Sequence, residues 1–320
     1  MEDKLDEVLQ KYDFNVASKS RIRGAVLIDT DKGFKLVKET RSSAGRLVWE
    51  NRVKNHLRDN GFKRIDAYCI NNEGNISTPD MYGVRYTVSD WYIGNECNLN
   101  DVKQVYLASK NLGELHIKLD GFETDSDCMQ PVQPEITARF EKHNVELKHI
   151  RNYLKNRNDR NEFEIRLLKA YPSFYAEAEE AVSKLGKVTG WNTYKVIHGS
   201  YTYHNLIMCE DGIATTVFDK SRYGPRLMDL YYFLRKVMEK NEWAFEYGMA
   251  VMSGYESYRR LEENEMRALK LLLLYPEKFW KLASYYMNSK KTWMSQKNLE
   301  KLDALEKQRL NRHKFIDEIS

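Results

Sequence analysis

Short apolar runs separated by polar turns dominate the first hundred positions of the chain. Residues 24–30 and 34–38 are two such runs, and the loop between them ends at Gly33. This pattern predicts a β-hairpin, because glycine accepts the positive φ that a tight turn needs. Further runs with the length and composition of strands lie at residues 65–70, 76–77 and 83–92. The pattern therefore predicts a small sheet near the N-terminus.

Apolar residues at three- and four-residue steps predict helices in the rest of the chain. Two of these helices belong to the first region, at residues 5–12 and from Ser43 to Leu57. Beyond about residue 99 helical spacing prevails, in stretches at residues 102–116, 140–168, 174–185 and 295–316 and through Tyr231, Phe245, Met266 and Leu282. Only a β-rich segment at residues 194–218 interrupts it. We expect an α+β fold in which a small mixed region precedes a larger, mainly helical one.

The composition is that of a folded soluble protein, since 42% of the 320 residues are hydrophobic and 31% are charged. The net charge is +4 without a concentrated basic stripe, so a nucleic-acid partner is not expected. The longest apolar run, residues 271–275, is far too short to span a bilayer, so no membrane association is expected. The chain begins with acidic residues and lacks the apolar core of a signal peptide, which predicts cytoplasmic synthesis.

The four cysteines are scattered, and none forms the C-x-x-C pair of a zinc or redox site. A chain of this length does not depend on disulfides for stability. Free thiols in a reducing cytoplasm are therefore expected at Cys69, Cys97, Cys128 and Cys209.

Residues 196–219 form the segment that most suggests a chemical site. An apolar entry leads into a polar loop at residues 198–205, and a short strand with a tight-turn signal at Asp211-Gly212 follows. The return strand ends at Asp219. This layout brings the polar loop and the strand end together. Sites that hold a nucleotide phosphate through Mg²⁺ use such a layout, because the metal takes oxygen ligands from two backbone segments.

The polar loop resembles the H-G-D-x-x-x-x-N catalytic loop of aminoglycoside phosphotransferases, choline kinases and related small-molecule phosphotransferases, with His198, Gly199, Ser200 and Asn205 at the matching positions. Over essentially its whole length the chain also resembles the CotS family of spore coat proteins. The order and spacing of several short motifs support that resemblance, at residues 23–24, 36–38, 61–62, 91–97, 112–116, 275–279 and 285–286.

The resemblance implies a bilobal protein-kinase-like fold. Residues 1–95 would form a small N-terminal β-sheet lobe with one helix, and residues 96–320 a larger helical C-terminal lobe that includes the catalytic-loop-like hairpin at residues 196–219. The cofactors that this resemblance leaves open are ATP and Mg²⁺, and it makes neither of them certain.

Matching positions then suggest roles for individual residues on the N-terminal side. Lys38 matches the lysine that contacts the α- and β-phosphates of the nucleotide, and Glu50 matches the ion-pair partner of that lysine. The hinge that receives an adenine ring would include Ser89, Asp90 and Trp91.

On the loop side, Asn205 matches the asparagine that ligates the metal, and Asp219 falls on the second acid of the D-F-D run. His198 matches a buried structural histidine, with proton transfer as the alternative role. Two positions depart from the pattern of active enzymes: Ser200 stands where the catalytic aspartate is expected, and Val217 where a metal-binding aspartate is expected. A serine hydroxyl is no general base at neutral pH, and a valine cannot hold Mg²⁺.

Three functions remain open from the sequence. The leading hypothesis is a degenerate kinase-like protein with a structural or assembly role in the endospore coat, made in the mother-cell cytoplasm and deposited with other coat proteins. The alternative is an ATP- and Mg²⁺-dependent phosphotransferase of the aminoglycoside phosphotransferase type that acts on a small-molecule hydroxyl, with Asp219 and Asn205 as metal ligands. A third possibility is nucleotide binding without chemistry.

Overall fold

The computed structural model describes residues 2–22, 24–123, 131–132, 135–289 and 296–319. The chain divides into two compact units. Unit 1 comprises Met1–Val132, Tyr194–Phe233 and Ala250–Arg259, and unit 2 comprises Gln133–Thr193, Leu234–Met249 and Arg260–Ser320. The lobe boundary expected near residue 95 stays a prediction. Cys128 lies outside the described residues, and the other three cysteines have free thiols.

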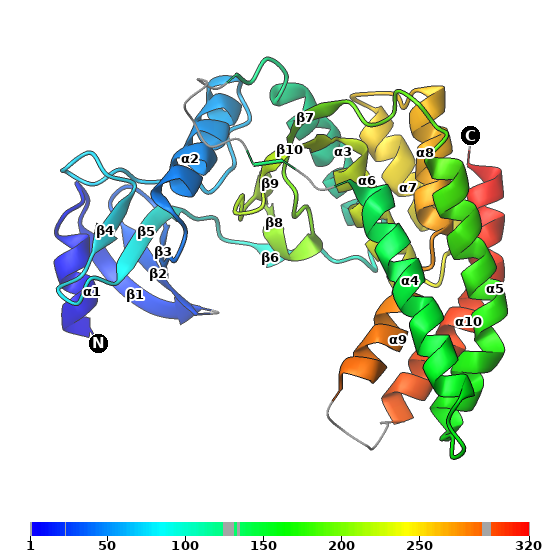
Figure 1. The fold of residues 1–320 in the computed structure, drawn as a ribbon. Coiled ribbons are helices and arrows are strands. Elements are labelled where there is room, and N and C mark those ends of the chain that lie inside the picture. Colours follow the sequence, from blue (N-terminus) through cyan, green and yellow to red (C-terminus); the bar gives the residue numbers. More distant parts are fainter. Residues whose placement is uncertain (1, 23, 124–130, 133–134, 290–295, 320) are drawn as a thin grey trace. The chain divides into compact units, whose positions relative to one another are not determined.

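A five-stranded antiparallel sheet forms the N-terminal part of unit 1 (Figure 1). Its spatial order is β1-β2-β3-β5-β4, with β1 at Val16–Ile22, β2 at Ala25–Thr30, β3 at Lys35–Glu39, β4 at Ser77–Pro79 and β5 at Arg85–Asp90. Val26 pairs with Val37 across the predicted hairpin, and Gly33 has a φ of 82° in its turn. Helix α1 (Glu2–Leu9) packs Val8 and Leu9 against the sheet.

Helix α2 (Ala44–Asp59) follows the hairpin, as the sequence predicts. It begins after Ser43, whose side chain accepts a hydrogen bond from the Arg46 N–H at 3.2 Å and so caps the free end of the helix. Two charged side chains, Glu50 and Lys54, share the buried face of α2 with the apolar ones. Because they are four residues apart, both point the same way, into the cavity described below.

Two small sheets complete the β structure of unit 1. β6 (Asn95–Glu96), β8 (Leu206–Cys209) and β9 (Gly212–Thr215) form one antiparallel sheet, and β7 (Tyr194–Ile197) pairs with β10 (Arg222–Pro225) in the other. A single 3₁₀ turn, Tyr203–Asn205, precedes β8. Helix α3 (Val102–Lys118) belongs to unit 1, together with the first half of α6 (Leu227–Lys240) and the second half of α7 (Phe245–Glu256).

The described part of unit 2 consists of helices and their connections. They are α4 (Ile136–Lys155), α5 (Glu162–Leu185), α8 (Glu263–Leu274), α9 (Glu277–Asn288) and α10 (Gln296–Glu318), together with the second half of α6 and the first half of α7. Apolar side chains from α4, α5, α9 and α10 form one core, in which the rings of Phe174 and Phe279 stack at 4.5 Å. This core gives the long helices a buried face despite their many charges.

The helical stretch predicted at residues 140–168 is broken in the structure. Helix α4 ends at Lys155, where Arg160 donates a hydrogen bond from Nε to the carbonyl of Leu154 at 2.6 Å. Helix α5 then begins with a capping box between Asn161 and Glu164. The break arises because a capping asparagine starts a new helix more favourably than it continues an old one.

The strand predicted at residues 65–70 was also wrong. This segment forms only isolated bridges, from Ile65 to Thr215 and from Tyr68 to Ser89, and no continuous ladder. Strand β1, by contrast, was not predicted, because its residues are mostly exposed and polar.

The predicted fold class is confirmed: an antiparallel sheet with one crossing helix precedes a mainly helical remainder. Among the helices in the described ranges, none is both long and apolar enough to cross a lipid bilayer.

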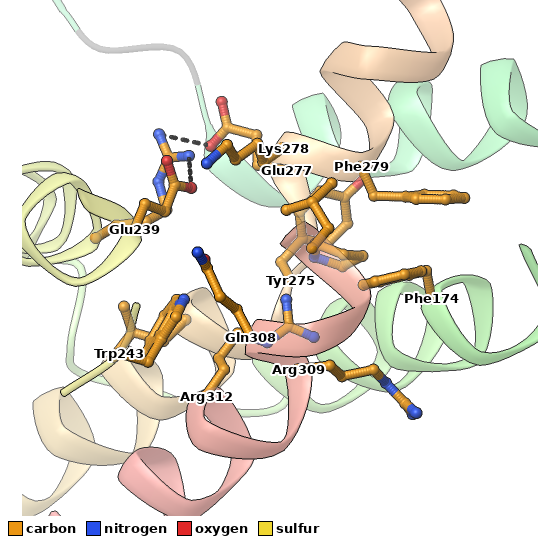
Figure 2. Close-up of a pocket in the computed structure, with 14 residues that line it drawn as sticks. Phe174, Glu239, Trp243, Tyr275, Glu277, Lys278, Phe279, Gln308, Arg309 and Arg312 are labelled. Carbon is orange, nitrogen blue, oxygen red and sulfur yellow. Dashed lines mark hydrogen bonds and ion pairs between the residues drawn. The ribbon is translucent and has the colours of Figure 1, made fainter. Parts of the chain in front are cut away.

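Two buried titratable groups in unit 2 predict its response to acid. Burial alone would raise the pKa of Glu277, but the positive charges of Arg235 and Lys281 outweigh burial and lower this pKa to about 2. Burial, together with the charge of Arg139, lowers the pKa of His143 to about 4. Figure 2 shows Glu277 in its charged surroundings.

Both shifts weaken the folded state as the pH falls. A folded-state histidine pKa of about 4 means that stability is lost between pH 6.5 and 4, where only the unfolded chain takes up the proton. The depressed pKa of Glu277 adds a loss between pH 4.5 and 2. We expect hydrogen exchange of α4 and α9 peptides to accelerate from pH 6.5 downward, after correction for intrinsic rates. In a His143→Phe variant, the part of this acceleration that occurs above pH 4 should be absent. Protection from exchange in the parent that is the same at pH 4 as at pH 6.5 would contradict the account.

Candidate functional site

A cavity of about 630 Å³ lies in unit 1 and contains most of the site residues predicted from the sequence. Its lining includes Lys38, Glu50, Ser89, Trp91, Asn205 and Asp219. Strands β1 to β3, helix α2, the segment after β5, strand β8 and residues 216–219 all contribute to its walls. The volume is in the range of small-molecule and cofactor sites.

Apolar side chains form part of the cavity wall. Ile22, Ala25, Leu27 and Leu36 line it from the sheet, and Ile207 lines it from β8. In the described chain, no hydrogen bond uses the backbone N–H or C=O of residues 92–93, which also border the cavity. A cavity that is lined by apolar side chains and by unused backbone donors and acceptors suits a planar heterocycle.

Asp90 does not line the cavity, although it belongs to the predicted hinge. Its carboxylate accepts a hydrogen bond from the Lys35 ammonium at 2.6 Å, and this pair closes the end of β3 against β5. Its neighbours Ser89 and Trp91 face the cavity, as alternation along a strand requires.

Glu50 is not paired with Lys38. Its carboxylate lies 3.1 Å from the Arg46 Nε and accepts a short hydrogen bond from the Tyr68 hydroxyl. Within the described chain the Lys38 ammonium has neither a hydrogen bond nor an ion pair. Arg46 lies one turn before Glu50 on the same helix and reaches the carboxylate first, which leaves Lys38 as a free cation of the cavity.

Sequence reasoning missed a buried ion pair at the back of the cavity. Lys54, which is 1% exposed, donates to the Asp66 carbonyl at 2.8 Å, and its Nζ lies 3.2 Å from the Asp66 Oδ1. The ammonium also lies 3.8 Å from the centroid of the Tyr68 ring. The helical spacing of α2 could have indicated that Lys54 is buried, because it places this lysine on the same face as Val53 and Leu57.

The His198 loop is held by one buried carboxylate. Asp229 accepts hydrogen bonds from the backbone N–H groups of His198 at 2.7 Å and Gly199 at 2.9 Å, and from the His116 Nε2 at 3.3 Å. Burial alone would raise the pKa of Asp229, but the His116 hydrogen bond and the N–H donors lower it. Burial lowers the pKa of His116, so the pair consists of a neutral imidazole and an ionised carboxylate.

Gly199 is required by the path of this loop. Its φ is 73°, and a Cβ at this position would lie 2.1 Å from the Lys220 carbonyl oxygen. Only glycine accepts both the left-handed backbone and the close approach of another segment.

His198 is fully buried and is hydrogen-bonded inside the loop. Its Nδ1 accepts from the Ser200 N–H at 3.2 Å, so its Nε2 carries the proton and donates to the Thr216 carbonyl at 3.1 Å. Burial lowers the pKa of His198. With both ring nitrogens engaged in the loop, the imidazole has no free position for proton transfer.

Ser200 and Asn205 interact with each other. The Asn205 Nδ2 donates to the Ser200 carbonyl at 2.9 Å and lies 3.4 Å from its hydroxyl. Asn205 lines the cavity with its amide oxygen free of hydrogen bonds in the described chain, whereas Ser200 is set back from the cavity lining. The loop therefore offers the cavity a neutral amide and no carboxylate.

Val217 adopts a strained backbone at the end of the hairpin. Its φ is 63°, which is unusual for a β-branched residue, and its N–H donates to the Asp66 Oδ2 at 2.9 Å. Strand β9 ends at Thr215, so Val217 and Asp219 belong to the following turn. Both line the cavity that contains Lys38.

Asp219 is exposed, and its carboxylate has no partner within the described residues. The Arg46 guanidinium holds its backbone, donating to its carbonyl at 2.6 Å. In the described part of the chain, no group of three or more histidine, cysteine, aspartate or glutamate side chains is arranged to hold a metal ion. Asp219 and the Asn205 amide are the groups that would contact a cation in the cavity.

A second, much smaller cavity lies in unit 2 among Trp243, Tyr275, Gln308 and Arg312 (Figure 2). Its volume of about 20 Å³ suits a single water molecule rather than a substrate. The unpartnered Nε of Arg312 supplies a donor for such a water.

No protein-family model matches the chain. A curated relative is spore coat protein S of Bacillus subtilis strain 168, which is 22% identical over 331 aligned positions that cover 98% of this chain and 93% of the relative. The alignment therefore spans both proteins nearly from end to end.

Solved structures of small-molecule kinases share the fold. An aminoglycoside phosphotransferase from Alicyclobacillus acidocaldarius superposes with a TM-score of 0.87 at 17% identity, with 98% of this chain and 94% of that chain covered. A spectinomycin phosphotransferase in complex with ADP and spectinomycin gives 0.66 at 14% identity, covering 99% and 97%. An amicoumacin kinase in complex with AMP-PNP and Ca²⁺ gives 0.65 at 15% identity, covering 98% and 93%. The chain is thus a distant homologue of spore coat protein S with the fold of aminoglycoside phosphotransferases.

Proposed function

We propose that this protein has a structural or assembly role in the bacterial endospore coat and that its kinase-like site performs no phosphotransfer. The observation that supports this most is Val217, an apolar, strained residue at the point of the cavity wall where a metal-binding carboxylate is expected. Ser200 adds to it, because a hydroxyl bonded to the Asn205 amide supplies no general base.

The distant homology to spore coat protein S supports the coat assignment. On this proposal the protein is made in the mother-cell cytoplasm and deposited on the developing spore with other coat proteins as its partners. The charged, mostly exposed helix faces of unit 2 would then be surfaces for assembly, and the fold would matter more than the site.

A phosphotransferase remains the second candidate, and specific residues favour it. The free Lys38 ammonium, the free Asn205 amide oxygen and the free Asp219 carboxylate line one cavity of suitable size. In that case Lys38 would contact phosphates, and Asn205 with Asp219 would hold Mg²⁺. The structures that share the fold include complexes with ADP and AMP-PNP.

Spores of the source bacterium distinguish these two functions. We expect an allele encoding Asn205→Ala with Asp219→Asn to give spores with a normal coat and a normal amount of the protein, because the fold loses only the local hydrogen bonds between the Asn205 amide and Ser200. An Asp229→Ala allele, which removes a buried fold-stabilising carboxylate, should fail to accumulate in the coat. A coat defect in the double variant at a normal protein level would contradict the structural role and favour a role for site chemistry.

A further inference from the structure

The charged groups around the unit 1 cavity have a balance that bears on its ligand. The lining contains two ammonium groups and four carboxylates, from Lys38, Lys54, Glu50, Asp66, Glu96 and Asp219. A cavity with this surplus of acids repels a polyanion unless the acids are neutralised within the protein. The partners of each group therefore decide which charges a ligand would meet.

The Lys54 ammonium interacts with neighbouring groups of the protein. The Asp66 carbonyl accepts a hydrogen bond from its Nζ at 2.8 Å, the Asp66 Oδ1 lies 3.2 Å away as an ion-pair contact, and the Tyr68 ring covers another side. An ammonium has three N–H donors, so little of this charge remains for a ligand. In return, the Asp66 carboxylate is compensated by Lys54 and by the Val217 N–H.

Two other carboxylates of the cavity are paired as well. The Glu50 carboxylate forms an ion pair with the Arg46 guanidinium and accepts a hydrogen bond from the Tyr68 hydroxyl. Glu96 lies 2.7 Å from the His204 Nδ1, a contact that is a hydrogen bond and becomes an ion pair only when the imidazole is protonated. Within the described residues this leaves Lys38 and Asp219, one of each sign, as the lining charges that have neither a hydrogen bond nor an ion pair.

This balance does not suit a nucleoside triphosphate. One free ammonium compensates about one phosphate charge, and the remaining phosphates would meet Asp219 in a partly desolvated cavity. A divalent cation normally relieves such repulsion, but Val217 removes one ligand, and the described residues form no acidic or imidazole cluster for a metal.

From this charge balance, and building on the proposed absence of phosphotransfer, we propose that the cavity binds a nucleoside or nucleoside monophosphate without a divalent cation. The base packs on the apolar side chains of the wall and hydrogen-bonds to the unused backbone groups of residues 92–93, and the single phosphate binds Lys38. Asp219 then acts as a selectivity residue that disfavours additional phosphates. In this role Asp219 weakens the binding of additional phosphates, whereas as a metal ligand it would strengthen it.

Isothermal titration of the full-length protein with adenosine, AMP, ADP and ATP, each in EDTA and in Mg²⁺, tests the inference. We expect AMP to bind at least about tenfold tighter than ATP, because one charge-assisted hydrogen bond is gained without added repulsion. Mg²⁺ should change each affinity by less than about twofold. Lys38→Met should weaken AMP about tenfold and leave adenosine unchanged, whereas Lys301→Met, at an exposed position on α10, should change neither.

Asp219→Asn gives the sharpest outcome. If Asp219 repels extra phosphates, this variant should bind ATP more tightly than the parent, both with and without Mg²⁺. Weaker binding of ATP with Mg²⁺ in Asp219→Asn, or ATP with Mg²⁺ as the tightest ligand of the parent, would overturn the inference. Equal affinities for adenosine and AMP would overturn the assignment of Lys38. Absence of binding by all four compounds at millimolar concentration would also overturn the inference, while the proposed coat role would stand.

Discussion

Replacing Asp229 with alanine is expected to lower the free energy of unfolding by at least about 3 kcal/mol. The carboxylate is 1% exposed and accepts hydrogen bonds from two backbone N–H groups and from the His116 ring. Alanine would leave these donors buried without acceptors, at a cost of about 1–3 kcal/mol for each unsatisfied group. Because His198 and Gly199 follow β7 directly, the loop that borders the cavity would lose its anchor.

Urea unfolding, combined with hydrogen exchange of peptides from residues 196–205, measures this effect. Asp211→Ala is a matched control, since that carboxylate is 72% exposed and pairs only with Arg64 at the surface. Its replacement should change stability little, because exposed ion pairs contribute little. The stability of Asp229→Asn should lie between those of the two alanine variants, because asparagine keeps one hydrogen-bond acceptor in place. An Asp229→Ala variant as stable as the Asp211→Ala control would show that the carboxylate does not anchor the loop.

Placing aspartates at both departing positions is expected to create ATP hydrolysis that depends on Mg²⁺. In the Ser200→Asp, Val217→Asp variant, the new acid at 217 would meet Asp219 and Asn205 at the cavity wall and complete a set of oxygen ligands. Aspartate also tolerates the φ of 63° at position 217 better than valine does. The acid at 200 would supply a base that orients the attacking hydroxyl or water.

The expected rate of phosphate release is roughly a hundredfold above that of the parent, the lower end of what a positioned base contributes. Ser200→Asn with Val217→Asn keeps the size and backbone tolerance of the aspartates without their charge, and it should remain inactive. Equal increases in phosphate release by the aspartate and asparagine variants would contradict this prediction. So would a folded aspartate variant that releases phosphate no faster than the parent. Either result would show that the absence of carboxylates at positions 200 and 217 does not explain the inactivity of the site.

Local patterns predicted the parts of the fold that depend on neighbouring residues. The hairpin at Gly33 and the start of helix α2 after Ser43 are such cases, because the turn and the helix start are encoded within a few positions. The polar loop at His198 and its nearness to Asp219 also followed from one contiguous segment. The strand expected at residues 65–70 did not form, because this apolar segment is fixed by contacts to distant residues instead.

Side-chain interactions between distant parts of the chain could not be predicted from the sequence. The pair between Lys54 and Asp66 and the hydrogen bond from Val217 to Asp66, which spans 151 positions, bring together segments with no common pattern. Matching positions suggested that Lys38 would pair with Glu50, but competition from Arg46 depends on side-chain geometry. The charge balance of the cavity, and hence its ligand, follows from these partnerships.

The rate of phosphate release from ATP with Mg²⁺ by the unmodified protein tests the central claim most directly. We expect the parent to release phosphate no faster than its Asp219→Asn variant, at high protein concentration and over hours, because the site lacks a base at 200 and a ligand at 217. Release by the parent more than about tenfold above the Asp219→Asn variant would contradict the account, because it would show that the site turns over ATP.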